Sequence, residues 1–63
     1  MEYYTYFIYN KKQIGSASGI LPIQKDMLVK LHGYENDNFI VDHLVFKYDH
    51  PDTNPGLYVY LEK

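Results

Sequence analysis

The chain of 63 residues contains no cysteine, no tryptophan and no arginine. Without cysteine it has no disulfide bridge, no thiolate ligand for a metal ion and no thiol nucleophile. A domain of this length buries only ~60% of the surface that its unfolded chain exposes, so residues 1–63 are expected to form one β domain with one core. Good packing or self-association must then supply the stability that disulfides supply in many small domains.

The sequence also has little net charge and no long apolar run. Six lysines against eight acidic residues give a formal charge of −2, which offers no long-range attraction to phosphate backbones or anionic lipid. The N-terminal residues have no basic segment or small-residue cleavage site, and no apolar run approaches the ~20 residues of a membrane span. We therefore expect a cytoplasmic protein with no membrane partner, and nucleic acid is disfavoured as a ligand.

Tyrosine, by contrast, occurs eight times. A chain this short cannot bury so many large rings completely, because its core is small. Some of the rings should therefore remain on the surface as a half-apolar face of the kind that binds another molecule. Five of the tyrosines lie near the two ends of the sequence: Tyr3, Tyr4, Tyr6, Tyr58 and Tyr60.

Alternating apolar and β-branched side chains predict five short strands and no helix of useful length. The expected strands cover residues 2–9, 13–17, 27–31, 39–48 and 57–61. A tight turn at Asn10-Lys11 or Lys11-Lys12 would join the first two strands as a hairpin. Residues 49–56 contain two prolines, which predict a loop before the final strand.

The fourth expected strand changes its period at Asp42-His43. Phe39 and Val41 share one face, and the apolar pattern resumes one residue out of step at Leu44. A β-bulge would restore the register, because it lets two residues of one strand oppose one residue of its neighbour. The alternative is that Ile40 and Leu44 face inward, which leaves Phe39 and Val41 on the outer face.

Together these elements predict an all-β, five-stranded antiparallel fold, either an SH3-like, partly open barrel or a strongly curved sheet. The first or the last strand would then present an open edge. The expected core consists of apolar side chains on the inner face: Phe7, Ile14, Leu21, Met27, Val29, Leu31, Val41, Leu44, Phe46, Leu57, Val59 and Leu61.

Residues 22–62 combine a proline-led entry with Lys25-Asp26 and three alternating apolar strands. Their patterns are Met27-x-Val29-x-Leu31, Phe39-x-Val41-x-x-Leu44-x-Phe46-x-Tyr48-Asp49 and Leu57-x-Val59-x-Leu61-Glu62. About two-thirds of the chain thus resembles short β-rich accessory proteins of bacteriophages and prophages. It departs from them at Lys25, where a glycine is common, and in its long proline-containing loop.

This resemblance implies a context and no site residue. Such proteins are made in an infected bacterial cell, where they often bind and inhibit or modulate a host enzyme or defence protein. The expected location is therefore the cytoplasm of a bacterial host cell, and the expected partner is a bacterial protein.

Few residues are candidates for chemistry. His32, His43 and His50 are spread over three expected elements, and Asp42 and Asp49 directly precede two of them. Adjacent residues of a strand point to opposite faces, so Asp42 cannot orient His43 unless a bulge rotates one of them. We interpret these residues as solvated polar groups and turn formers, and we expect no metal, no cofactor and no enzymatic activity.

The segment from Gly15 to Gly19, Gly-Ser-Ala-Ser-Gly, has the small residues of a phosphate-cradling loop. It lacks the lysine and the helix that would complete such a loop. We therefore interpret it as a flexible connector.

The terminal tyrosines allow two interpretations. If the first and last strands are neighbours, the rings simply pair across the strands and stabilise the sheet by ~0.2–1 kcal/mol per pair. The same geometry would also form a rigid platform with hydroxyl groups at its surface, as tyrosines do at protein interfaces. The candidate protein-binding residues are Tyr4, Tyr6, Tyr58 and Tyr60, with Tyr3 and Tyr9 as the alternative to Tyr4 and Tyr6 on the first strand.

Three functional hypotheses follow. The first is a non-enzymatic protein-binding module, a phage-type accessory protein that inhibits or modulates a bacterial target. The second is a small barrel that binds single-stranded nucleic acid, which would require several lysines to converge beside the rings. The third is a self-assembling structural protein, for example a homodimer, in which an open strand edge pairs with its twin.

Overall fold

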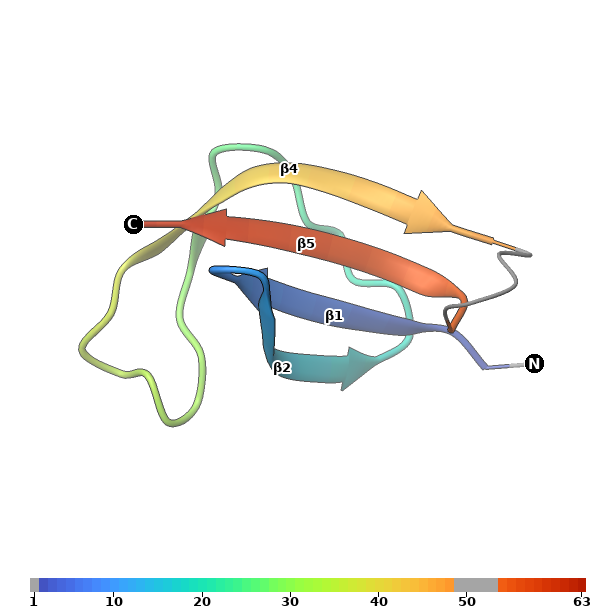
Figure 1. Ribbon diagram of the computed structural model, residues 1–63, viewed down its shortest axis with the longest axis horizontal. Helices are drawn as coiled ribbons and strands as arrows, with labels where there is room; N and C mark the ends of the chain where they lie inside the picture. The colour runs from blue at the N-terminus through green and yellow to red at the C-terminus, as the bar shows by residue number, and fades with distance from the viewer. Residues whose placement is uncertain (1, 49–53) are drawn as a thin grey trace.

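The computed structural model describes residues 2–48 and 54–63, and within them it contains strands and no helix. The expected all-β class is confirmed (Figure 1). The described residues form five strands, the number expected. The expected loop over residues 49–56 lies mostly outside the described residues. The strands are β1 (Tyr4–Tyr9), β2 (Lys12–Ser18), β3 (Leu28–Val29), β4 (Phe39–Lys47) and β5 (Gly56–Glu62).

All five strands belong to one strongly curled sheet with the order β2-β1-β5-β4-β3. The expectation of a fully antiparallel sheet is wrong, because β1 and β5 pair in parallel while the other neighbours are antiparallel. A parallel pair needs a long connection, and here nearly the whole chain lies between the two strands. The expected open edge is wrong too, because β1 and β5 are both internal and the edges are β2 and β3.

The hairpin of β1 and β2 turns at Asn10 and Lys11. Both residues have positive φ angles, 54° and 64°, the backbone of a turn whose twist matches that of the flanking strands. This confirms the first of the two expected turn positions. The ladder shifts its register opposite Phe7 and Ile8, where Ile14 is the additional residue of β2.

The expected bulge of β4 is confirmed. Val41 pairs with Leu61 and His43 pairs with Tyr60, so Asp42 is the additional residue. The bulge keeps Val41 and Leu44 on the same inner face, with one shared core. The alternative, in which Phe39 and Val41 face outward, is wrong because both side chains are fully buried.

The core lies on the inner face of the sheet, under the segment that connects β2 to β4. That segment packs Leu21, Ile23 and Leu31 against the buried cluster, and in Figure 1 it passes behind β4 and β5. The buried cluster comprises Phe7, Val29, Phe39, Val41, Val59 and Leu61. Every expected core residue is in this cluster or packs against it, except Met27 and Phe46.

Met27 and Phe46 are exposed because each lies at the margin of the sheet. Met27 directly precedes the edge strand β3 and is 39% exposed. Phe46 lies on the inner face near the end of β4, opposite Leu57, and is 54% exposed. Conversely, Phe39 was not expected in the core and is fully buried.

No segment within residues 2–48 and 54–63 is a helix of the length and apolarity that a membrane crossing requires.

Candidate functional site

The sheet brings the four candidate tyrosines onto its outer face. Tyr6 of β1 pairs directly with Tyr58 of the parallel strand β5, while Tyr4 and Tyr60 lie two residues further along their strands, in opposite directions. Residues two apart in a strand share a face, so all four side chains point away from the core. We call this surface, formed by Tyr4, Tyr6, Tyr58 and Tyr60, the tyrosine face.

The rings of the tyrosine face pack against one another. Tyr6 and Tyr58 are stacked, with ring centroids 4.8 Å apart and an angle of 30° between the planes. The ring of Tyr4 lies 6.2 Å from that of Tyr6. As a result Tyr6 is only 9% exposed, whereas Tyr4, Tyr58 and Tyr60 are half-buried. Tyr6 therefore anchors the face, and its neighbours supply the accessible surface.

Two hydroxyl groups of the face are held by hydrogen bonds. Tyr4 donates to Glu2 Oε2 at 2.8 Å, and Tyr58 donates to the Asn54 carbonyl at 2.8 Å. The hydrogen bond to Glu2 and the negative charge of that carboxylate raise the pKa of Tyr4. Both contacts limit the rotation of the rings, so less conformational entropy is lost when a partner binds.

Two side chains of β4 extend the tyrosine face. The ammonium group of Lys47 lies 4.4 Å from the centroid of the Tyr58 ring, within the range of a cation–π interaction. The imidazole of His43 stacks on Tyr60, with centroids 4.4 Å apart and planes 6° from parallel. The outer surface of three strands thus combines apolar rings, hydroxyl groups and one ammonium group.

The bulge also brings together the side chains of Asp42 and His43, which a regular strand would direct to opposite faces of the sheet. His43 Nδ1 lies 2.7 Å from Asp42 Oδ2, so the rotation that the sequence argument required does take place. The hydrogen bond from His43, and after it one with Glu62, lowers the pKa of the Asp42 carboxyl group. Both side chains are about half exposed. Asp42 therefore orients His43 against Tyr60, and solvent remains in contact with the pair.

The three candidate histidines do not form one site in the part of the chain that the structure describes. His32 is fully exposed and lies 3.8 Å from Glu35 in the connection between β3 and β4, and His50 lies outside the described residues. Among the described residues, no group of three or more histidine and carboxylate side chains is placed to hold a metal ion.

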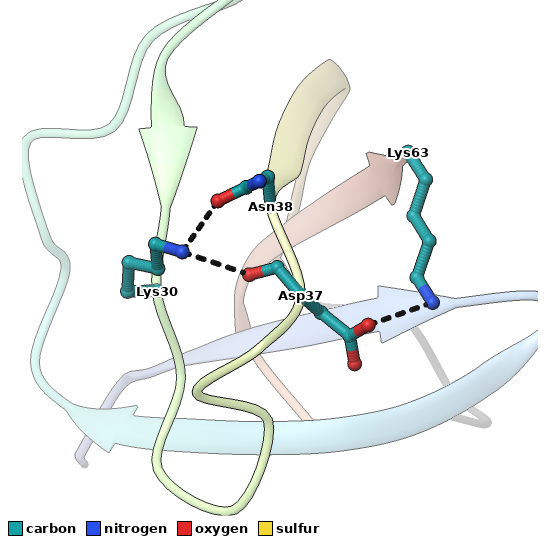
Figure 2. A network of polar contacts seen from close by, with 4 residues as sticks. All are labelled: Lys30, Asp37, Asn38 and Lys63. Atoms are coloured by element: carbon teal, nitrogen blue, oxygen red, sulfur yellow. Dashed lines mark hydrogen bonds and ion pairs between the residues drawn. The ribbon is translucent and has the colours of Figure 1, made fainter.

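Two of the lysines are engaged at another part of the molecule (Figure 2). Lys30 donates to the Asp37 carbonyl at 3.4 Å and to Asn38 Oδ1. Lys63 forms an ion pair with Asp37 Oδ1 at 2.9 Å, which raises the pKa of Lys63. The bonds of Lys30 join the two ends of the connection between β3 and β4, and the ion pair of Lys63 attaches that connection to the C-terminal end of β5.

The sequence argument did not predict the exposed aromatic cluster of Tyr3, Phe46 and Tyr48. The ring of Tyr3 lies 6.1 Å from that of Phe46 and 6.2 Å from that of Tyr48. Phe46 is 54% exposed and Tyr48 is 64% exposed. The period of β4 correctly places Phe46 on the inner face, but periodicity carries no information on where the covering segment ends.

Comparisons with known protein families, with curated proteins and with solved structures find no significant match. The assignment of the site therefore rests on the geometry of this chain.

Proposed function

We propose that the chain is a non-enzymatic protein-binding module that docks a partner protein through the tyrosine face. The observation that carries this proposal is the gathering of Tyr4, Tyr6, Tyr58 and Tyr60 from opposite ends of the sequence onto one outer surface. The covering segment of the core packs on the opposite, inner face. Tyrosine is enriched at interface hot spots, because it offers a large contact area at little cost in rotamer entropy.

The stacking of the rings supports this proposal by pre-organisation. Tyr6 packs against both Tyr4 and Tyr58, and the ring of His43 is stacked on that of Tyr60. A surface whose side chains are already ordered loses less entropy on binding than a mobile one. The same contacts also stabilise the sheet, so packing and binding are compatible uses of these residues.

The charged and polar side chains beside the tyrosine face indicate which chemical groups a partner would present there. Lys47 is placed over Tyr58, while Asp42 and His43 lie beside Tyr60. A complementary partner presents an apolar or aromatic patch with a carboxylate near Lys47 and polar groups at its rim. We further propose, on the resemblance to phage accessory proteins, that the partner is a bacterial host or defence protein that the chain inhibits or modulates.

Binding of single-stranded nucleic acid is the second candidate, because Lys47 and stacked aromatic rings are the components of a stacking platform. The net charge of −2 opposes it, and so does the engagement of Lys30 and Lys63 with the connection between β3 and β4. Its signature would be an affinity that falls steeply as the salt concentration rises.

The test is affinity capture from nuclease-treated bacterial lysate with the tagged chain as bait. The wild type should retain a stoichiometric protein, and the double variant Tyr58→Ala with Tyr60→Ala should lose it. Tyr48→Ala is the matched control, since Tyr48 is an exposed tyrosine outside the face, and this variant should retain the partner. Tyr4→Ala and Tyr60→Ala as single variants leave the stack of Tyr6 on Tyr58 in place and should each weaken capture.

Two results would contradict the proposal. Retention of the same protein by the folded double variant would show that the tyrosine face is not the interface. Unfolding of the double variant, combined with undiminished capture by the two single variants, would show that the rings serve the sheet alone. If every retained molecule disappears on nuclease treatment, the nucleic-acid candidate replaces the proposal.

A further inference from the structure

The edge strand β2 leaves one row of backbone groups without partners. Gly19 N–H donates to the Tyr3 carbonyl at 2.8 Å, so these two residues form a hydrogen-bonded pair of the antiparallel ladder. Such pairs alternate with pairs whose N–H and C=O groups point away from the neighbouring strand. In the β1–β2 register, the next pair, Tyr4 with Ser18, therefore belongs to the second kind, and so does Tyr6 with Ser16.

It follows that the N–H and C=O groups of Ser16 and Ser18 point toward the open edge. Within residues 2–48 and 54–63, no hydrogen bond outside the β1–β2 ladder involves the backbone of either serine. A row of unpaired backbone groups is a template for another extended strand.

The two edges of the sheet differ in how well they are protected. The other edge, β3, is only two residues long, Leu28–Val29, and Lys30 follows it directly; short strands and lysines both discourage pairing. β2 runs for seven residues, Lys12–Ser18. Its bulge lies at Ile14 near its start, and the regular part that follows, residues 15–18, contains neither a charge nor a proline.

The residues of β2 fit a second copy of the same strand. When two β2 strands run antiparallel about a two-fold axis at Ala17, Ser16 of each copy lies opposite Ser18 of the other. These are the residues whose backbone groups point outward, so each such pair can exchange both of its hydrogen bonds. Serine opposite serine adds a favourable cross-strand contact between hydroxyl groups. No like charges face each other, and the small side chains allow the backbones to approach.

We propose that two copies of the chain pair through the β2 edge, with Ser16 of each copy bonded to Ser18 of the other in one continuous sheet. The two-fold axis of such a pair is perpendicular to the sheet, so both outer faces lie on the same side. The dimer therefore presents two tyrosine faces side by side. This inference concerns the purified chain and does not depend on the proposed function.

The test compares wild type, Ser16→Pro and Ser16→Ala by sedimentation equilibrium at chain concentrations from about 10 µM to about 1 mM, where small interfaces associate. The wild type should pass from the mass of one chain to that of two. Ser16→Pro removes an outward N–H group without touching the β1 ladder, a position that tolerates proline in edge strands, and it should remain a monomer. Ser16→Ala keeps the N–H group and should dimerise within a few-fold of the wild type.

Amide hydrogen exchange locates the contact. The amides of Ser16 and Ser18 should exchange quickly at low concentration and become protected as the dimer forms, while the Ala17 amide should be protected at both concentrations. If Ser16→Pro does not fold, Ser16→Lys replaces it, because an edge lysine opposes pairing and leaves the backbone intact. A wild type that stays monomeric at about 1 mM, or a dimer that survives the folded proline or lysine variant, would overturn the proposal.

Discussion

Thr5 is a fully buried polar residue of β1, on the same side of the strand as the core residue Phe7. Its hydroxyl group donates to the Gly19 carbonyl at 2.8 Å and accepts from the Leu21 amide at 3.0 Å. These bonds attach the start of the covering segment to the sheet. One side chain thus satisfies two backbone groups that a buried loop would otherwise leave unpaired.

Replacing Thr5 with valine should therefore destabilise the protein by about 1–3 kcal/mol, because both backbone groups lose their partner while the volume is kept. Thr5→Ser keeps the hydroxyl group and should cost only about 0.8 kcal/mol for the lost methyl group. Urea denaturation of the two variants measures both values. Equal losses would show that packing, and not hydrogen bonding, is the contribution of this residue.

The Asp42 carboxyl group makes stability depend on pH. The hydrogen bond from His43 lowers the pKa of this group in the folded protein from its ordinary value of 3.8. A group with a depressed folded-state pKa contributes stability above its unfolded-state pKa and loses that contribution as the pH falls through the folded-state value. The contribution of Asp42 should therefore be complete at neutral pH, begin to decline as the pH falls below about 4, and be lost once the pH has passed the folded-state pKa.

Thermal unfolding from about pH 6 to about pH 2 tests this expectation with Asp42→Asn and His43→Phe. The wild type should melt higher than Asp42→Asn at pH 6, and the difference between their melting temperatures should close as the solution is acidified. His43→Phe keeps a ring against Tyr60 and removes the donor to Asp42, so its acid sensitivity should also be reduced. A difference that stays constant over the whole range would contradict the role of the pair.

At the scale of the element, the bulge of β4 reconciles two apolar patterns that are one residue out of step. Val41 and Leu44 reach the same core only because Asp42 is unpaired with β5. A one-residue slip without a bulge would turn every following side chain to the other face. The same bulge places Asp42 against His43, so a feature that serves packing also shapes the edge of the tyrosine face.

Deletion of Asp42 should therefore leave a folded protein, since a regular ladder without the additional residue still keeps Val41 and Leu44 inward. Deletion of Ile40 is the matched control. It would turn the fully buried Phe39 outward, at a cost of about 1.5–3 kcal/mol or more. Urea denaturation and amide spectra compare the two deletions. If deletion of Asp42 lowers the free energy of unfolding more than deletion of Ile40 does, this account of the bulge is contradicted.

At the scale of the whole molecule, β5 unites the sheet. It lies between β1 and β4 and pairs with both, and it supplies the buried residues Val59 and Leu61. β1, the first strand of the sequence, therefore gains its second neighbour in the sheet only when β5, the last strand, pairs with it. Pairing of such distant segments requires closure of a long loop, which slows folding.

A chain that ends at Lys47 should consequently fail to fold, because it lacks the strand that joins the β1–β2 hairpin to β4. Circular dichroism should show no cooperative thermal transition for this chain. Removal of Lys63 alone is the control: it deletes the ion pair with Asp37 and leaves β5 complete, so the cooperative transition should persist. A cooperative transition in the shorter chain would contradict the central role of β5.

The sequence by itself determined the local features of this protein. Local patterns predicted the strands, a turn at Asn10-Lys11 or Lys11-Lys12 and, as one of two alternatives, the bulge at Asp42-His43, because these features depend on backbone preferences and on side chains a few residues apart. Alternation also placed Tyr58 with Tyr60 on one face of the last strand and, as one of two alternatives, Tyr4 with Tyr6 on one face of the first.

Only the tertiary structure decided which strands are neighbours and what covers the core. The parallel pairing of β1 with β5 joins segments about fifty residues apart, and periodicity within a strand carries no information on such partners. The exposure of Phe46 and the burial of Phe39 depend on where the covering segment lies. The open edge at Ser16 and Ser18 likewise follows from strand order and ladder alternation, which are properties of the assembled sheet.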